Sequence, residues 1–318
     1  MAAADRKAVV VGISGCSSSG KTTLARLLRD IFPNTFILHE DDFYKNDKDI
    51  PISVDGLADW DCAEALSLPE MEQALAHIRT HGVLPVSRNS HLSSRTDHGS
   101  KRRRAAPQGP FLVSSPLSEP STHESLLTQP FSPSQPALFS KEDQNSVGKC
   151  PVSDETIEAM KAKVKAWLQP GQPGHKLVAS SSSDSSSDSN TLRVCIFDGF
   201  LLYSEETRAA MEQIDVRLFL RVSHTKATQR REARDGYVTL EGFWQDPPGY
   251  VDKIVWPNYV KAHKWLFDDD DVEGTPNRAT LEANRILTQL DKGIDVDMAT
   301  TLEWAVSTLM HELEGKYL

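Results

Sequence analysis

The stretch "GISGCSSSGKTTLARLL" has a spacing of glycine, lysine and threonine that suits the binding of phosphate groups. The pattern G-x-x-x-x-G-K-[ST] is matched by Gly15, Gly20, Lys21 and Thr22. Glycine lets the backbone turn so tightly that successive N–H groups face one anion, and the following helix adds the positive end of its dipole. Lys21 can then reach the outer phosphates, and the Thr22 hydroxyl can bind the magnesium ion that bridges them. The predicted nucleotide-binding residues are Gly15, Cys16, Ser17, Ser18, Ser19, Gly20, Lys21, Thr22 and Thr23.

Acidic residues follow two further strand-like runs. Residues 35–38 are apolar and extended in character, and Asp41 and Asp42 come just after them. Residues 194–197 form a second apolar run, which ends at Asp198. Ligands of open α/β sheets bind outside the carboxyl ends of the strands, so we expect these carboxylates beside the phosphate loop (residues 15–23). Asp41 would then meet an acceptor hydroxyl, and Asp198 would help to hold magnesium.

Two other stretches could line a substrate site. In "GLADWDCAEAL", Trp60 and Asp61 fall at a predicted helix start, where Asp61 could instead cap the helix while Trp60 packs over it. In "TKATQRREARDGY", three arginines fall within little more than one helical turn: Arg230, Arg231 and Arg234. Such a helix can be a solvated surface. It also suits a lid, at about 226–250, that brings positive charge to a transferring phosphoryl group and excludes water.

The elements that must position these residues alternate between strands and helices. Apolar runs predict strands at 9–13, 35–38, 193–197 and 216–222. Helices are predicted after the phosphate loop and at 71–79, 225–234 and 298–316, with a further helix that has Ser153 or Asp154 as its N-cap. This alternation predicts an α/β fold, with a parallel sheet flanked by helices as in phosphate-loop NTPases. We expect one such domain over residues 1–318.

Two stretches interrupt the alternation. Residues 86–149 are rich in Ser, Pro, Gln and His and have no sustained period, and 178–191 contain the low-complexity run "SSSSDSSSDSN". Neither can bury enough apolar surface to offset chain entropy, so both are predicted to be disordered insertions. Lengthening a surface loop to this extent costs only about 2 kcal/mol of closure entropy. One core can therefore carry both insertions.

The composition limits the class of protein. A net charge of −10 argues against general nucleic-acid binding, and "KRRR" at 101–104 fits a solvated charge run better than an import signal. No apolar signal region or membrane-length segment is present, so no membrane partner is expected. The four cysteines have no metal-like spacing. We expect an intracellular protein, cytoplasmic with the nucleus as a further candidate compartment, and the sequence indicates no protein partner.

A phosphate loop alone fits a kinase, a GTPase switch or a motor. A GTPase should add D-x-x-G after a strand and an N-K-x-D guanine reader, and neither occurs in a suitable place. A kinase needs a carboxylate at the acceptor hydroxyl, metal ligands and mobile cations. A regulator that binds ATP without turnover is the non-enzyme alternative, but it has no need of a base at Asp41. The residues therefore favour a magnesium-dependent kinase of a small hydroxyl substrate.

Five stretches together resemble the nicotinamide riboside kinases, within the wider uridine kinase-like group: "GISGCSSSGKTTLA", "EDDFYK", "DWDCAEAL", "DGFLLY" and "PGYVDKIVWPNY". The match covers residues 8–79 and 192–261. The resemblance implies magnesium- and ATP-dependent phosphorylation of the ribose 5′-hydroxyl of nicotinamide riboside, which gives the mononucleotide used to make NAD. Nicotinic acid riboside is a second candidate substrate, and a uridine or cytidine kinase is the alternative reading.

The resemblance also implies roles for single residues. Asp41 would take the hydroxyl proton and, with Thr22 and Asp198, would place the metal. Trp60 would lie against the pyridine ring and Asp61 would hold the ribose hydroxyls, while the three lid arginines would bind ATP. The implied substrate-binding residues are Asp41, Asp42, Phe43, Tyr44, Trp60, Asp61 and Tyr237. Two departures stand out: Asp198 occupies a position where the family often has Glu, and the lid is longer than expected.

Overall fold

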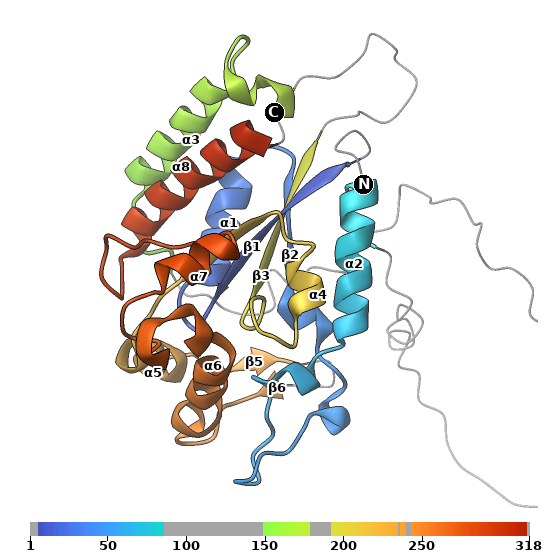
Figure 1. Ribbon diagram of the computed structural model, residues 1–318, viewed down its shortest axis with the longest axis vertical. Coiled ribbons are helices and arrows are strands. Elements are labelled where there is room, and N and C mark those ends of the chain that lie inside the picture. The colour runs from blue at the N-terminus through green and yellow to red at the C-terminus, as the bar shows by residue number, and fades with distance from the viewer. Residues whose placement is uncertain (1–5, 86–148, 179–191, 235, 240–242, 317–318) are drawn as a thin grey trace, which may run out of the picture. The chain divides into compact units, whose positions relative to one another are not determined.

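The computed structural model describes residues 6–85, 149–178, 192–234, 236–239 and 243–316 (Figure 1). The chain divides into two units, Met1–Pro85 with Phe139–Leu318 and, separately, Val86–Leu138. The second unit lies outside the described residues. The predicted insertions at 86–149 and 178–191 also fall there, apart from residues such as Lys149 and Val178 at their ends. The prediction that both are disordered therefore stays a prediction.

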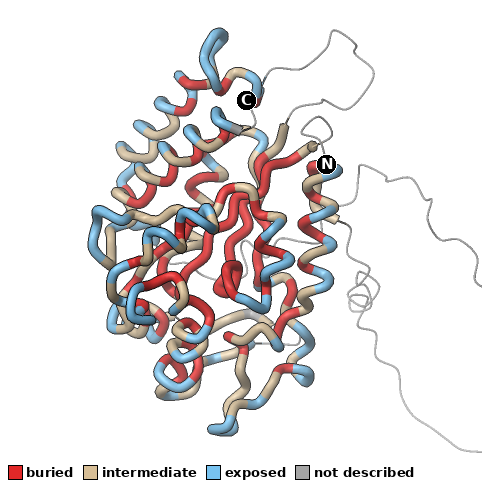
Figure 2. Tube along the Cα trace, viewed as in Figure 1, coloured by how far each residue is buried: buried red, intermediate tan, exposed pale blue. Residues whose placement is uncertain are grey.

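A five-stranded parallel sheet, in the order β2-β3-β1-β4-β7, forms the centre of the first unit. The strands are β1 (Ala8–Gly15), β2 (Thr35–His39), β3 (Arg193–Gly199), β4 (Val216–Leu220) and β7 (Ile286–Leu287). Every residue of β1 is buried, because helices cover both faces of the sheet (Figure 2). The predicted α/β fold with a parallel sheet flanked by helices is confirmed.

Alternate residues of β1 point into two separate cores. Val9, Val11 and Ile13 pack with α1 (Lys21–Ile31), α3 (Asp154–Trp167) and α8 (Met298–Lys316). Ala8 and Val10 pack with the other face, which is covered by α2 (Leu68–His81), α4 (Arg208–Met211), α6 (Trp256–His263) and α7 (Arg278–Ala283). Figure 1 shows α3 and α8 side by side on the first face, with α2 and α4 on the second. The period of two along the strand thus produces the two layers.

A helix and a pair of short antiparallel strands stand at the carboxyl end of the sheet. Helix α5 (His224–Glu232) follows β4, and the short antiparallel strands β5 (Tyr237–Val238) and β6 (Phe243–Trp244) follow α5. Gly236 precedes β5 with a φ of +127°, and a Cβ atom there would lie 2.4 Å from the Phe243 ring. Glycine is therefore required at the base of this hairpin. The polypeptide then passes through a π-helical turn, Val251–Val255, into α6.

Candidate active site

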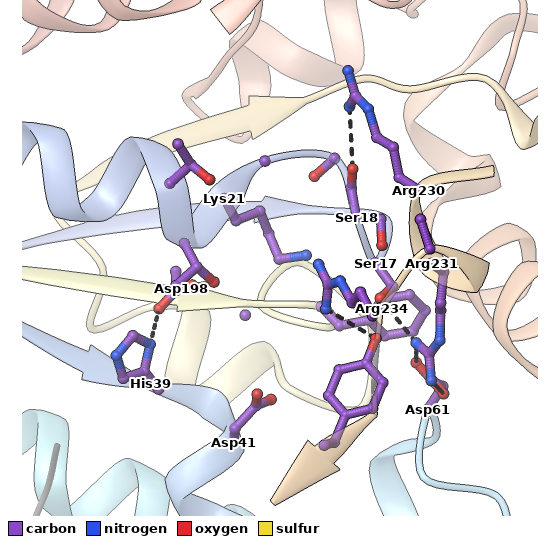
Figure 3. Close-up of a pocket in the computed structure, with 18 of the residues that line it drawn as sticks. Ser17, Ser18, Lys21, His39, Asp41, Asp61, Asp198, Arg230, Arg231 and Arg234 are labelled. Atoms are coloured by element: carbon purple, nitrogen blue, oxygen red, sulfur yellow. Dashed lines mark hydrogen bonds and ion pairs between the residues drawn. The ribbon is translucent and has the colours of Figure 1, made fainter. Parts of the chain in front are cut away.

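A cleft of about 650 Å³ opens at the carboxyl ends of the strands, where the sequence predicts the phosphate loop and the carboxylates to meet (Figure 3). Its walls come from the phosphate loop, the ends of β2 and β3, the segment around Trp60, helix α5 and the β5–β6 hairpin. Most of the predicted site residues line it: Ser17, Ser18, Ser19, Gly20, Lys21, Thr22, Thr23, Asp41, Tyr44, Trp60, Asp61, Asp198, Arg230, Arg231, Arg234 and Tyr237.

The phosphate loop bends at its two glycines. Gly15 and Gly20 have φ angles of +149° and +99°, and a Cβ atom on Gly20 would lie 2.3 Å from Met298 Cε. Lys21 begins α1, and its Nζ donates to the carbonyl oxygens of Gly15 and Cys16 at 2.9 Å each. Burial lowers the pKa of the Lys21 ammonium. Gly15 and Cys16 do not line the cleft, and burial raises the pKa of the Cys16 thiol to about 12, which makes it inert.

Asp198 is held at the end of β3 by two neighbours. The Thr22 hydroxyl donates to its Oδ2 at 2.6 Å, and His39 Nδ1 lies 2.5 Å from its Oδ1. His39 is the last residue of β2 and stands opposite Asp198 in the parallel register. Burial alone would raise the pKa of Asp198, but the His39 ring and the Thr22 hydroxyl outweigh it and lower that pKa. The same pairing, against burial, raises the pKa of His39 to about 9.

A 3-10 turn, Glu40–Phe43, decides which acidic side chain reaches the cleft. Asp41 exposes its carboxyl group to the cleft, and the surrounding protein raises its pKa by displacing water. Asp42 instead accepts the His39 backbone N–H at 3.3 Å, and Phe43 is buried in the core. Successive side chains in a 3-10 turn point about 120° apart, so the neighbours of Asp41 turn away from the cleft. Asp42 and Phe43 therefore do not line the cleft, and their predicted role in substrate binding stays a prediction.

Asp61 does not begin a helix, which corrects the prediction from sequence. A short 3-10 turn, Ala63–Ala65, has Cys62 at its N-cap, and α2 starts only at Leu68. The Asp61 carboxylate is buried and pairs with Arg231, at 3.0 Å for Nη1 to Oδ1 and 3.2 Å for Nη2 to Oδ2. Its charge is therefore used in a tertiary ion pair rather than at a helix terminus.

Arg231 joins three parts of the cleft. Besides Asp61, it donates to Asp246 through Nε at 2.6 Å and Nη2 at 3.2 Å, and to Ser17 Oγ through Nη1 at 2.8 Å. Burial opposes its charge, but the carboxylates of Asp61 and Asp246 raise the pKa of Arg231 well above its usual value. We call Asp61, Arg231 and Asp246 the arginine cluster. It connects the phosphate loop, the segment around residue 61 and the end of the hairpin.

The other two predicted arginines reach different partners. Arg230 Nη1 donates to the carbonyl oxygen of Ser18 at 3.1 Å, so it lies over the phosphate loop (Figure 3). Arg234 Nη1 donates to Tyr237 Oη at 2.9 Å, and the Arg231 guanidinium lies 5.0 Å from the centre of the same Tyr237 ring. The structure thus brings the three arginines and Tyr237 to one cleft.

Aromatic side chains gather in another part of the cleft wall. The Trp60 ring meets Tyr44 edge to face at 5.4 Å and lies 5.9 Å from Trp244. Tyr250 Oη accepts the Trp60 backbone N–H at 3.1 Å and donates to the Ala58 carbonyl at 2.9 Å, which fixes the segment that carries Trp60. Trp244 was missed by the sequence reasoning. Its only sequence signal is an aromatic residue next to the glycines of the predicted lid.

A further group of cleft residues was missed because it carries no motif. It comprises Lys149, Pro151, Lys226, Asp295, Val296, Asp297 and Met298.

Among the described residues, no group of three or more His, Cys, Asp or Glu side chains is arranged to hold a metal ion. None of the helices in the described ranges is both long and apolar enough to cross a membrane.

A five-stranded parallel sheet flanked by helices, with the G-x-x-x-x-G-K-T loop between β1 and α1, is the architecture of an α/β phosphate-loop kinase. The chain belongs to the nicotinamide riboside kinase family. It is 33% identical over 309 residues to the nicotinamide riboside kinase of Schizosaccharomyces pombe, covering 97% of this chain and 99% of that protein. This match confirms the resemblance to the nicotinamide riboside kinases that the sequence motifs indicated.

Two further relatives differ in coverage. The nicotinamide riboside kinase of Saccharomyces cerevisiae is 27% identical over 85% of this chain and 83% of its own length. Human nicotinamide riboside kinase 1 is 39% identical over 70 residues, which is 22% of this chain and 35% of that protein. No family model matches the chain.

Proposed function

We propose that this protein is an ATP-dependent kinase that phosphorylates the ribose 5′-hydroxyl of nicotinamide riboside and gives nicotinamide mononucleotide for NAD salvage. Membership of the nicotinamide riboside kinase family supports the substrate. The observation that carries the proposal is one cleft with two chemically distinct parts, which we call its two ends: the phosphate loop with Lys21, and the aromatic and acidic wall with Trp60 and Asp61. A phosphoryl donor and a nucleoside acceptor need such an arrangement.

At the first end, backbone N–H groups of the phosphate loop and the start of α1 hold the nucleotide phosphates. Lys21 lies at this point with two of its three ammonium donors on loop carbonyls, which leaves one for a phosphate oxygen. Arg230, above the loop at Ser18, adds charge that stabilises the transferring group. The expected nucleotide is ATP.

Thr22 and Asp198 fit a magnesium ion that arrives with the nucleotide. Their oxygens lie 2.6 Å apart at the edge of the cleft, and Asp41 faces the same space. Magnesium commonly takes one or two carboxylates and completes its shell with phosphate oxygens and water, so a protein cage of three carboxylates is not needed. When bound, the ion would neutralise charge on the phosphates. Asp198 is shorter than Glu, and we expect its contact with the metal to pass through a water molecule.

Asp41 is the proposed general base. Its carboxylate faces the cleft, and the raised pKa favours acceptance of a proton. The 5′-oxygen forms a bond to the γ-phosphorus as the bond from that phosphorus to the bridging oxygen of ADP breaks, and the hydroxyl proton passes to Asp41. The products are the mononucleotide and ADP.

At the second end, Trp60 is the proposed platform for the nicotinamide ring. That ring is a pyridinium cation, which the electron-rich face of an indole attracts. Asp61 has one lone pair on each oxygen committed to Arg231, and a carboxylate offers about four acceptor sites, so it can still accept from the ribose hydroxyls. Trp244, 5.9 Å from Trp60, would limit the space above the base.

The test is a set of initial rates with purified protein and Mg-ATP on nicotinamide riboside, nicotinic acid riboside, uridine and cytidine. We expect the highest kcat/KM with nicotinamide riboside. A higher value with uridine or cytidine would overturn the proposed substrate in favour of a pyrimidine nucleoside kinase. ATP binding without turnover of any of the four would instead favour a regulator.

The role of Asp41 is tested with the same substrate. Asp41→Asn removes the base and is expected to lower kcat by about 10²- to 10⁴-fold while ATP still binds. The matched control is Asp42→Asn, whose amide oxygen can still accept the His39 N–H; its kcat should stay within a few fold of the native value. Equal losses in the two variants would remove Asp41 from the role of base.

A further inference from the structure

One wall of the cleft comes from a segment to which the proposed chemistry assigns nothing. Lys149 and Pro151 line the cleft together with Asp297 and Met298, where α8 begins. Lys149 and Pro151 stand just before α3, and Lys149 is the first described residue after position 85. None of the sequence motifs covers them.

The segment is held in place on the side away from the cleft. Val152 is buried, and the Ser153 hydroxyl caps α3 by accepting the Thr156 N–H at 3.3 Å. Helix α3 is in turn attached to α8 through Trp167 Nε1, which donates to Glu314 Oε1, and through Lys163 Nζ, which donates to Ser307 Oγ at 2.7 Å. Lys149 lies five residues before this docked helix, and its side chain lines the cleft.

Two carboxylates and an ammonium group lie at this end of the cleft, and the ammonium group can attract an anionic ligand. Asp295 accepts the Ser223 N–H and hydroxyl at 2.8 and 2.7 Å, and Asp297 accepts the Thr300 N–H and hydroxyl at 2.9 and 2.7 Å. These donors are neutral, so both carboxylates keep their negative charge, but each is oriented toward a helix start. Within the described part of the chain, the ammonium of Lys149 has no carboxylate partner.

A second ammonium at the cleft points to the same chemistry. Lys226 and Arg230 are four residues apart and share one face of α5, the face whose Arg230 reaches the phosphate loop. Lys226, like Lys149, lines the cleft and has no carboxylate partner among the described residues. Cations from two segments, each outside the phosphate loop, therefore line the nucleotide end.

We propose that Lys149 is a nucleotide-binding residue, whose ammonium contacts the triphosphate chain of the phosphoryl donor from the α3 side of the cleft. The inference rests on the proposed function for its nucleotide and adds a residue to the same site. A flexible, exposed ammonium contributes a modest attraction, since such pairs are strongly solvated. Its effect should therefore appear in the affinity for the nucleotide rather than in the chemical step.

The test compares Lys149→Ala and Lys149→Glu in the full chain. We expect KM for ATP to rise about twofold to fivefold in the alanine variant and roughly tenfold in the glutamate variant. The value of kcat at saturating ATP and the KM for nicotinamide riboside should stay unchanged. Added potassium chloride should reduce the difference between native and variant proteins, because salt screens exposed charges. The matched control is Lys165→Glu, an exposed lysine of α3 that does not line the cleft.

Binding of a non-hydrolysable ATP analogue by calorimetry, without any nucleoside, separates this inference from the proposed function. Weaker binding in Lys149→Glu with native binding in Lys165→Glu supports the role of Lys149, even if nicotinamide riboside proves not to be the substrate. Native affinity in both Lys149 variants, with unchanged thermal melting, overturns it. An equal loss in Lys165→Glu also overturns it, since the effect would then come from the overall charge of the protein.

Discussion

The two ends of the cleft are built in different ways. At the phosphate end, one short stretch, residues 15–23, supplies the glycine bends, Lys21 and Thr22, and the backbone does much of the positioning. At the nucleoside end, the arginine cluster unites residues that are 170 and 15 positions apart in the chain, through side-chain ion pairs. The first end is local in sequence, whereas the second exists only when the tertiary fold has formed.

This difference has a consequence for how each end responds to mutation. The phosphate end concentrates its function in a few atoms of one loop, so loss of one cation should be severe. The nucleoside end shares its geometry among several side chains, and the loss of one should weaken binding by degrees. Arg231, which also donates to Ser17, is the point where the two ends meet.

The largest effect is expected for Lys21→Ala. This change removes the ammonium group that stands at the start of α1, so the outer phosphates lose their fixed cation. We expect turnover of nicotinamide riboside to be abolished, measured as product formed at saturating Mg-ATP. Near-normal kcat in this variant would remove the phosphate-loop interpretation and with it the contrast between the two ends.

An intermediate effect is expected at the nucleoside end. Asp61→Asn keeps the shape but loses charge-assisted acceptance worth about 1.5 to 3 kcal/mol, so the nucleoside KM should rise on the order of tenfold or more.

Asp246→Asn acts indirectly, because Asp246 accepts from Arg231 and from Trp244 Nε1 at 2.9 Å. Its nucleoside KM should rise about threefold to tenfold with a smaller change in kcat. Steady-state kinetics with varied nucleoside measures both.

The control for the arginine cluster is Asp252→Asn. Asp252 Oδ1 lies 2.9 Å from His224 Nε2 of α5 at the surface, and neither residue lines the cleft, so loss of this contact should change the nucleoside KM by less than about twofold. If Asp246→Asn behaves like Asp252→Asn, the nucleoside end does not depend on the arginine cluster. The comparison between the two ends would then have to be abandoned.

The same division explains what the sequence could predict. The phosphate loop and the juxtaposition of Thr22 with Asp198 follow from strand order and local spacing, and the structure contains both. Strands β1 to β4 and the last helix, 298–316, could also be predicted from apolar periodicity, and α8 has those bounds. Where a signal is local, the sequence carries it.

Features that depend on tertiary contacts were not predicted from the sequence. The sequence allowed Asp61 to be a helix cap or a substrate-binding residue, and neither interpretation included its ion pair with Arg231. A 3-10 turn after β2 turned Asp42 and Phe43 away from the cleft, although Asp41 beside them faces it. Short elements such as α4 and β7 were not predicted, since a few residues hold too little periodicity to detect.

The smallest effect is expected for replacement of the tract between α2 and α3. The same experiment tests whether the segment before α3 belongs to the phosphate end of the cleft. Replacing residues 86–148 by a flexible Gly/Ser linker of about 20 residues should leave kcat/KM within a few fold and the melting temperature nearly unchanged, because the composition of the tract cannot support a core. Loss of folding or activity would mean that the tract packs on the core or contributes to the site. A second variant, in which the linker also replaces Lys149, should differ from the first only by a higher KM for ATP. If the two variants have the same KM for ATP, Lys149 does not contribute to nucleotide binding. The phosphate end of the cleft would then depend on the phosphate loop and not on the segment before α3.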